Sequence, residues 1–144
     1  MRRALDLALQ GGEAGEVPVG AVVIGPSGEL IGAAYNRPVS TCDPTGHAEI
    51  LALREAATSV ANYRLPGCQV YVTIEPCTMC VGALVHSRIS RLVFGAREPK
   101  AGAVLSHPVN AGQKLNHKFD MVEGVLSEEC ARVMQDFFAR RRNA

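Results

Sequence analysis

No stretch of the 144-residue sequence approaches the roughly 20 consecutive apolar residues that a membrane-spanning helix needs. The basic N-terminus, with Arg2 and Arg3, also lacks the apolar core of a signal peptide, because Asp6, Glu13 and Glu16 follow closely. The sequence therefore predicts a protein that does not insert into a membrane and that stays in the cytoplasm.

The chain carries almost no excess charge of either sign, since its formal net charge is +1. Attraction of nucleic acid by the molecule as a whole is therefore excluded, and any RNA site must depend on a local cluster of basic residues. The run Arg140-Arg141-Arg142 is one such cluster. It also suits the solvated C-terminal end of a helix, where positive charge complements the helix dipole, so both interpretations stay open.

Internal repeats, linkers and low-complexity segments are absent, and 47% of the residues are hydrophobic. This predicts one domain over residues 1–144. Strands and helices alternate in the apolar pattern, which predicts an α/β layered fold with a central sheet. Gly11-Gly12 is expected to end the first helix, and Thr45 and Ser127 to cap later ones. The expected strands cover 17–24, 30–35, 68–74, 91–95 and, as a strand or only an extended segment, 119–125; the expected helices cover 3–11, 47–60, 76–86 and 127 onward.

Five cysteines, an odd number, do not suggest a framework of disulfide bonds. Cys42, Cys68 and Cys130 are interpreted as reduced thiols. Cys77 and Cys80 form a Cys-x-x-Cys pair, which is also found in thioredoxin-like redox proteins. A redox pair needs no histidine or glutamate upstream, so it would leave the motif described next without a role.

Two stretches carry the chemistry: His47-Ala48-Glu49 and Pro76-Cys77-Thr78-Met79-Cys80. One imidazole and two thiolates suit a tetrahedral zinc ion, and three protein ligands leave the fourth position for water, as in catalytic sites. Bound zinc lowers the pKa of such a water to about 7. Glu49 lies two residues from the histidine, close enough to take the proton of that water.

With this motif the chain resembles the zinc-dependent cytidine and deoxycytidylate deaminase superfamily. Longer stretches, which cover nearly the whole chain, resemble the bacterial tRNA-specific adenosine deaminases within it. These stretches are Glu16–Val22, Tyr35–Pro38, Asp43–Ile50, Asn62–Leu65, Val72–Cys77, His86–Ile89, Asn116-His117 and Phe137-Phe138.

The resemblance implies a three-layer α/β/α fold with a central mixed sheet, of the cytidine deaminase type, and one Zn²⁺ per subunit. It implies a hydrolase that converts adenosine to inosine at the wobble position of a tRNA anticodon, with Glu49 as the proton shuttle. The partners it implies are the tRNA anticodon stem-loop and a second copy of the chain in a homodimer, which the apolar face of helix 77–86 also suggests.

The resemblance also implies contacts with the substrate. Asn36 matches an asparagine that hydrogen-bonds the purine, and Val19 matches an apolar residue of the base pocket. The backbone N–H of Ala48 would face the oxygen on the reacting carbon, and Phe138 matches an aromatic near the flipped nucleotide. An ordinary turn asparagine and plain core packing remain the alternatives for Asn36 and Val19, and core or dimer packing for Phe138.

The loop with Glu98 and Lys100 matches the loop that meets the anticodon. Many relatives have aspartate at position 98, and residues 104–108 also depart from the family pattern, so the preference for RNA over DNA stays open. His107 and His117 are interpreted as surface or capping histidines and not as zinc ligands.

Two alternatives share the zinc ligands. A free nucleobase or nucleoside deaminase, acting on cytosine, guanine or adenine, would use the same catalytic residues. A structural zinc module that only binds RNA would need a fourth ligand, for which Cys42 and Cys68 are formal candidates although neither has ligand spacing.

Overall fold

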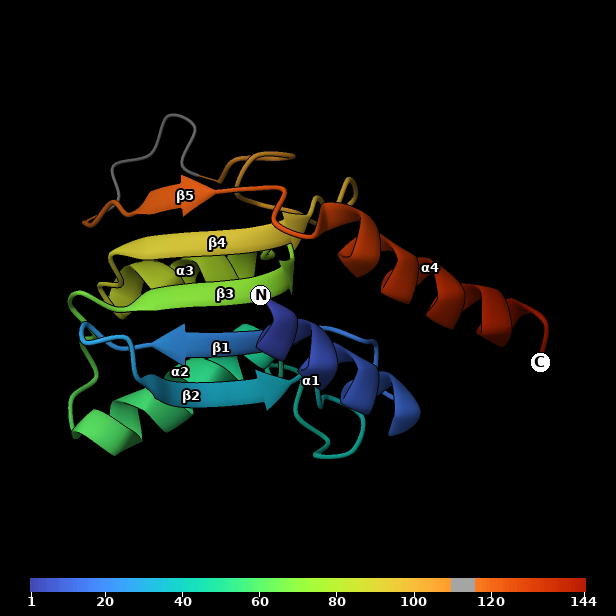
Figure 1. Ribbon diagram of the computed structural model, residues 1–144, viewed down its shortest axis with the longest axis horizontal. Coiled ribbons are helices and arrows are strands. Elements are labelled where there is room, and N and C mark those ends of the chain that lie inside the picture. The colour runs from blue at the N-terminus through green and yellow to red at the C-terminus, as the bar shows by residue number, and fades with distance from the viewer. Residues whose placement is uncertain (110–115) are drawn as a thin grey trace.

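The computed structural model describes residues 1–109 and 116–144 as one sheet with helices on both sides (Figure 1). The strands are β1 (Gly20–Ile24), β2 (Leu30–Tyr35), β3 (Gln69–Ile74), β4 (Arg91–Ala96) and β5 (Asp120–Val122); the helices are α1 (Arg2–Glu13), α2 (Ala48–Val60), α3 (Thr78–His86) and α4 (Ser127–Arg142).

The sheet is mixed, with the strand order β2-β1-β3-β4-β5. Strand β1 pairs antiparallel with both β2 and β3, and the hairpin expected for the first two strands is confirmed. Strands β3, β4 and β5 run parallel to one another. The segment around 120 is therefore a short strand at the edge of the sheet.

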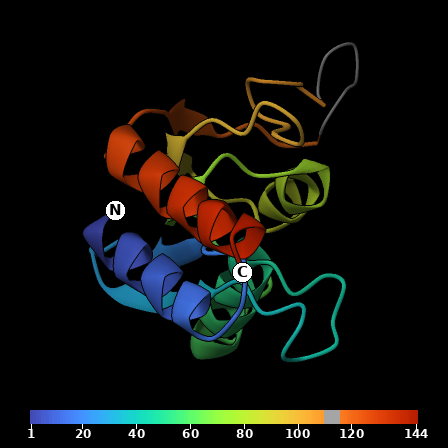
Figure 2. The ribbon, with the colours of Figure 1, turned by 90° about the vertical axis from the view of Figure 1, so that its right-hand side faces the viewer.

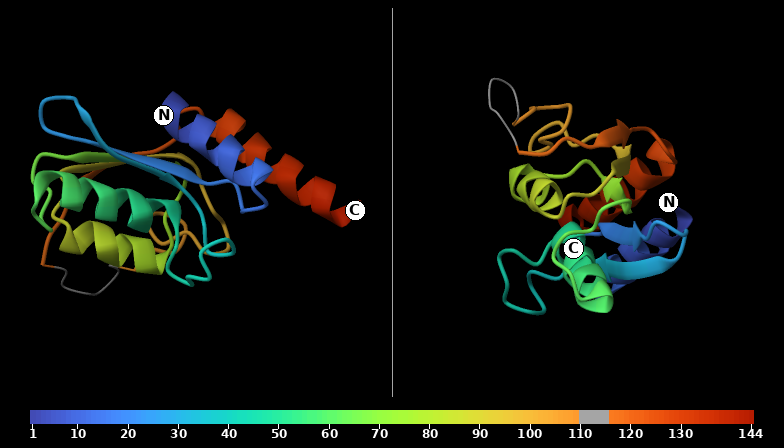
Figure 3. Two further views of the ribbon diagram at one scale, coloured as in Figure 1. Left: turned by 90° about the horizontal axis from the view of Figure 1, so that it is seen from below. Right: turned by 90° about the vertical axis from the view of Figure 1, so that its left-hand side faces the viewer.

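Helices α2 and α3 cover one face of the sheet, and α1 and α4 cover the other (Figure 3). The larger core lies under α2 and α3 and includes the buried residues Val72, Leu84, Phe94 and Ala52. A smaller core under α1 and α4 joins Leu5, Ile74, Ala96 and Cys130. The expected three-layer α/β/α architecture is confirmed.

Helices α1 and α4 lie side by side on their face of the sheet (Figure 2). The Arg2 guanidinium donates a hydrogen bond to the Glu129 carboxylate at one end of this pair, and Arg141 donates one to the carbonyl of Gly15 at the other. The last turn of α4 extends beyond the sheet (Figure 1). None of the helices in the described part of the chain combines the length and apolar character needed to cross a membrane.

The carboxyl ends of β3 and β4 lie side by side at one end of the sheet, where Ile74 pairs with Ala96. Helix α3 starts shortly after β3, and the segment 97–109 follows β4. In open α/β sheets, ligands bind outside the carboxyl ends of the parallel strands. A ligand-binding site is therefore expected at this end of the parallel strands.

The helix ends differ from the expected ones. Gly11-Gly12 does not end α1, which continues to Glu13. The reason is packing: a Cβ at position 11 would lie only 3.0 Å from the Tyr35 ring, so glycine lets the helix approach β2 closely.

The two expected helix caps are also wrong. His47 occupies the N-cap of α2, and the Thr45 hydroxyl instead donates a hydrogen bond to the Asp43 carboxylate. Leu126 occupies the N-cap of α4 in a left-handed conformation, so Ser127 is already the first helical residue.

Candidate active site

Three side chains meet where two helices begin. His47 is the N-cap of α2, Cys77 is the N-cap of α3, and Cys80 lies in the first turn of α3. The Nδ1 atom of His47 lies 3.6 Å from the Sγ of Cys77 and 3.5 Å from the Sγ of Cys80. All three candidate ligand atoms fall within 4.8 Å of one another.

These separations fit a zinc ion. With Zn–N of about 2.0–2.1 Å and Zn–S of about 2.3 Å, tetrahedral geometry sets the N–S separation at about 3.6 Å. Within residues 1–109 and 116–144, this is the group of His, Cys, Asp and Glu side chains placed to hold a metal, and neither Cys42 nor Cys68 joins it. The three ligands leave one tetrahedral position for water, which disfavours a closed structural zinc module.

The pKa values of the two cysteines are shifted in opposite directions. A hydrogen bond from the Cys80 thiol lowers the pKa of Cys77 to about 3, even though partial burial acts in the opposite direction. The same hydrogen bond, together with burial, raises the pKa of Cys80 well above its ordinary value. The hydrogen bond to Cys77 also raises the pKa of His47. The cluster therefore already stabilises one thiolate, which is the ligand form of cysteine.

Glu49 lies in the first turn of α2 and is 4% exposed. Burial raises the pKa of its carboxyl, and this outweighs the hydrogen bond with Cys80 and the attraction of His47, both of which lower it. A carboxylate with a raised pKa is a better base near neutral pH. The structure thus puts a proton acceptor beside the three metal-binding side chains.

Two of the predicted base contacts are linked through the backbone. The N–H of Asn36, directly after β2, donates to the carbonyl of Val19 at 3.0 Å. Asn36 and Ala48 are buried, whereas Val19 is half-buried and packs against the core. Core packing of Val19 is therefore observed, and it is compatible with a wall of a pocket.

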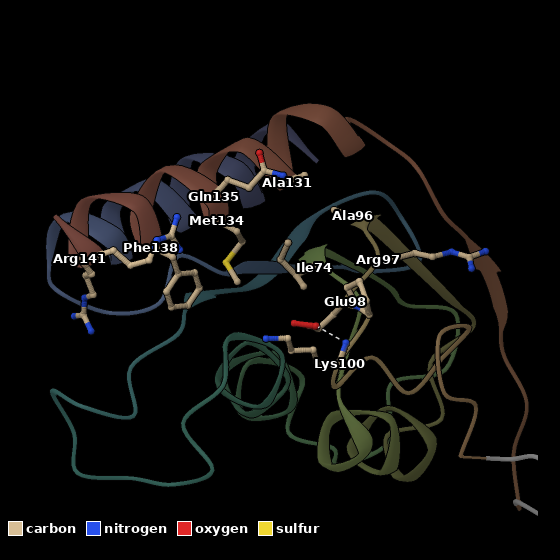
Figure 4. A pocket seen from close by; sticks show the side chains of 12 residues that line it. Ile74, Ala96, Arg97, Glu98, Lys100, Ala131, Met134, Gln135, Phe138 and Arg141 are labelled. Carbon is tan, nitrogen blue, oxygen red and sulfur yellow. Dashed lines mark hydrogen bonds between the residues drawn. The ribbon is translucent and has the colours of Figure 1, made fainter.

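Three further predicted residues, Glu98, Lys100 and Phe138, line one groove of about 760 Å³ between the end of β4 and helix α4 (Figure 4). Ile74, Ala96, Ala131 and Met134 line it with apolar side chains, and Arg97, Lys100, Arg141 and Arg142 add positive charge. Phe138 is 41% exposed, which leaves its ring accessible for stacking. An apolar groove with basic residues and an exposed aromatic ring suits a single-stranded nucleic acid.

The groove residues are partly engaged with one another. Glu98 accepts a hydrogen bond from the N–H of Lys100 at 2.7 Å, as Figure 4 shows. The guanidinium of Arg97 makes a two-pronged pair with Glu123, with N–O distances of 3.0 and 2.9 Å. Both cations are exposed, but Lys100, unlike Arg97, forms no ion pair among the described residues.

The two histidines that were not assigned as ligands have other contacts. A ring nitrogen of His107 lies 2.7 Å from the carbonyl oxygen of Pro99, and one of His117 lies 2.7 Å from that of Ile89. Both rings therefore tie backbone segments together.

Sequence reasoning gave no role to two buried glutamates, Glu16 and Glu75. Glu16 is 1% exposed and accepts hydrogen bonds from the N–H groups of Val39 and Ser40. Glu75 is 3% exposed and accepts five hydrogen bonds from residues 98–106. The available signal for Glu75 was a charged residue directly after the apolar strand 70–74, a position where an unpaired carboxylate is costly.

The chain matches the family model described as the cytidine and deoxycytidylate deaminase zinc-binding region over residues 1–96. It is 48% identical over 143 residues to a tRNA-specific adenosine deaminase of Haemophilus influenzae, covering 99% of this chain and 83% of the relative. A solved structure from a study of A-to-I editing by tRNA:A34 deaminases at the wobble position is similar with a TM-score of 0.87 and 41% identity, covering 92% of this chain and 96% of that one. A guanine deaminase from Nitrosomonas europaea is similar with a TM-score of 0.82 and 28% identity, covering 94% and 81%.

Proposed function

The chain belongs to the cytidine and deoxycytidylate deaminase family, and we propose that, within this family, it deaminates adenosine to inosine at the wobble position of a tRNA anticodon. The observation that carries the proposal is a metal-binding triad with a buried glutamate beside it. That site lies in a chain 48% identical, over almost its whole length, to a tRNA-specific adenosine deaminase.

His47, Cys77 and Cys80 would hold one Zn²⁺, which would supply an activated water near neutral pH. Glu49 accepts the proton of the attacking water on its carboxylate, as its raised pKa favours. The same carboxyl delivers this proton to N1 of the adenine ring, then takes the proton of the new 6-hydroxyl group and passes it to the departing 6-amino group. Water and adenosine thereby give inosine and ammonia, and Glu49 returns to its starting state.

The base is bound by residues at the ends of β1, β2 and the start of α2. The Asn36 side chain hydrogen-bonds the purine ring, and Val19 provides an apolar wall. The N–H of Ala48, at the N-terminus of α2, stabilises negative charge that develops on the attacking oxygen. The Asn36–Val19 backbone hydrogen bond supports this arrangement because it fixes the two residues relative to each other.

The RNA strand on either side of the base occupies the groove beside α4. Phe138 stacks on a base, Lys100 meets a phosphate, and Glu98 accepts a hydrogen bond from a ribose 2′-hydroxyl. The bases of an anticodon loop are already unpaired, so turning one out toward the metal costs little. A tRNA substrate also supports the cytoplasmic location expected from the sequence.

A second copy of the chain is proposed to pack on helices α2 and α3. Between them lies a shallow apolar depression of about 280 Å³, lined by Ile50, Leu53, Ala57 and Ala83 among others. Tyr63 also lines this depression and is 68% exposed, so its ring is available to a partner surface. Sedimentation of the zinc-loaded protein should give a dimer, and Tyr63→Glu should shift it toward monomer; a wild-type monomer would contradict the dimer.

The test of the function is inosine formation by the zinc-loaded protein on an anticodon stem-loop with adenosine at the wobble position. Matched reactions contain free adenosine, cytidine, guanine, and a DNA stem-loop of the same sequence. The proposal predicts turnover of the RNA stem-loop and its loss after zinc removal by a chelator. Turnover of guanine or a free nucleoside alone would instead favour the alternative raised by the similarity to the guanine deaminase.

A further inference from the structure

Glu75 is a buried carboxylate that the proposed chemistry does not use. It follows β3 directly, and its own N–H donates to the carbonyl of Ala96, which continues the pairing of β3 with β4. Its side chain is turned toward the segment that follows β4. The whole residue is 3% exposed, so water does not satisfy its oxygens.

Both carboxylate oxygens are fully occupied by one loop. Oε2 accepts the successive N–H groups of residues 104, 105 and 106 at 3.2, 2.8 and 2.8 Å. Oε1 accepts the N–H of Glu98 at 3.1 Å and the hydroxyl of Ser106 at 2.5 Å. Three successive N–H groups directed at one oxygen form a nest that is specific for an anion.

These hydrogen bonds join the two ends of the loop. Glu98 opens the segment and Ser106 closes it, so the carboxylate lies inside the turn that residues 98–106 make. Two features show how closely the loop surrounds it. A Cβ at position 102 would come within 2.4 Å of the Glu75 carboxylate, and the N–H of Ala103 donates to the carbonyl of Pro76 at 2.8 Å.

The same loop contributes Glu98, Pro99 and Lys100 to the groove beside α4. The position of Lys100 depends on the backbone of Glu98, because the Glu98 carboxylate accepts the Lys100 N–H and the Glu98 N–H is held by Glu75. Two hydrogen bonds thus connect the Glu75 carboxylate, through Glu98, to the backbone of Lys100.

We propose that Glu75 is a positioning residue for the RNA substrate: it fixes the 98–106 loop so that Glu98 and Lys100 meet the strand in the groove. This inference rests on the proposed function. The rival role is support of the metal site, since Glu75 lies two residues before Cys77. The two roles differ in what they predict, because a loop held for binding affects substrate affinity whereas a metal support affects zinc content and the rate of the bound complex.

The test is Glu75→Gln in the zinc-loaded, full-length protein. Glutamine keeps the size but replaces one accepting oxygen with an NH₂ donor, so it cannot satisfy both the 104–106 amides and the Glu98 N–H. We expect KM for the RNA stem-loop to rise about tenfold with kcat within about twofold of wild type, the pattern of a lost binding interaction. Zinc should stay at one ion per chain, and the dependence of log Kd on log salt should flatten by roughly one phosphate contact.

Three further measurements make the test decisive. Glu55→Gln, the same chemical change on the exposed side of α2, is the matched control and should behave as wild type. Amide hydrogen exchange at residues 104–106 should speed up in Glu75→Gln and not in Glu55→Gln. If Glu75→Gln does not fold, Ser106→Ala decides instead, because it removes a single one of the five hydrogen bonds and should raise KM about two- to fivefold.

An unchanged KM in a folded Glu75→Gln protein would overturn the proposal, as would continued protection of the 104–106 amides. A fall in zinc content or in kcat with KM unchanged would overturn it in favour of metal support. Failure of the wild-type protein to form inosine is a separate result, which would reject the proposed function before any variant is compared.

Discussion

Glu49 and Glu75 are two buried glutamates, one two residues after His47 and the other two residues before Cys77, and their surroundings shift their pKa values in opposite directions. Burial raises the pKa of Glu49, and its few hydrogen bonds do not compensate. Burial would also raise the pKa of Glu75, but hydrogen bonds from Ser106, Leu105 and Glu98 outweigh it and lower the pKa to about 2. The number of donors around each carboxylate, more than its depth, separates them.

The number of donors around each carboxylate indicates which of the two can accept and release a proton. A carboxylate with every lone pair occupied by N–H and O–H donors stays ionised and holds its neighbours in place. A desolvated carboxylate with spare capacity can accept and release a proton. Glu16 belongs with Glu75, since the N–H groups of Ser40 and Val39 hold its carboxylate against the loop after β2.

The largest expected effect comes from Glu49→Gln, which removes the proton acceptor while keeping the shape. The single-turnover rate of inosine formation should fall by about 10²- to 10⁴-fold, the usual contribution of general acid–base catalysis. Zinc content and stem-loop affinity should stay at wild-type values, because glutamine disturbs neither the ligands nor the groove. A variant with close to the wild-type rate would remove Glu49 from the chemistry and erase the contrast with Glu75.

A moderate effect is expected from Glu16→Gln, which puts a buried NH₂ group in place of one of the two carboxylate oxygens that accept the N–H groups of Val39 and Ser40. The free energy of unfolding should fall by about 1–3 kcal/mol, the cost of an unsatisfied buried group. Urea unfolding of the zinc-saturated proteins measures it, with the exposed Glu13→Gln as the matched control. A loss no larger than that of Glu13→Gln would show that Glu16 is not a structural carboxylate.

A smaller effect is the pH dependence of that difference. Burial would raise the pKa of Glu16, but the hydrogen bonds from Ser40 and Val39 outweigh it, so the folded pKa lies below the ordinary value of 4.5. Below pH 4.5 the unfolded chain therefore takes up the proton first, and the stabilisation is lost as the pH falls through the folded pKa. The stability gap between wild type and Glu16→Gln should be full near neutral pH and shrink in acid. A gap that is constant with pH would contradict the ionised state of Glu16.

The smallest effect is expected from Glu123→Ala. Glu123 is an exposed carboxylate paired with the exposed guanidinium of Arg97, and surface ion pairs contribute little to stability. The unfolding midpoint in urea should not change measurably, in contrast to Glu16→Gln. A destabilisation as large as that of Glu16→Gln would show that exposure does not separate these carboxylates as proposed.

The sequence predicted the metal site because the relevant signals are local. Cys77 and Cys80 are one helical turn apart, and His47 and Glu49 are two residues apart at the start of another helix. The apolar segments likewise predicted the strands of the described residues, although β1 begins at Gly20 and not at Val17. The segment 119–125, expected as a strand or only an extended segment, forms a strand at Asp120–Val122.

What the sequence did not predict depends on contacts between distant segments. The continuation of α1 through Gly11-Gly12 follows from its contact with Tyr35 on β2. The roles of Glu16 and Glu75 follow from backbone N–H groups more than twenty residues away, which carry no residue-specific signal. Such groups become partners only once the loops have folded around them.

The most direct test of the division between the two glutamates is to measure Kd and single-turnover rate for the RNA stem-loop with Glu49→Gln and Glu75→Gln side by side. Glu49→Gln should bind like wild type but form inosine very slowly. Glu75→Gln should bind more weakly but react at the wild-type rate once bound. The reverse pattern, or a loss of bound-state rate in both variants, would show that the two glutamates do not divide catalysis and binding between them.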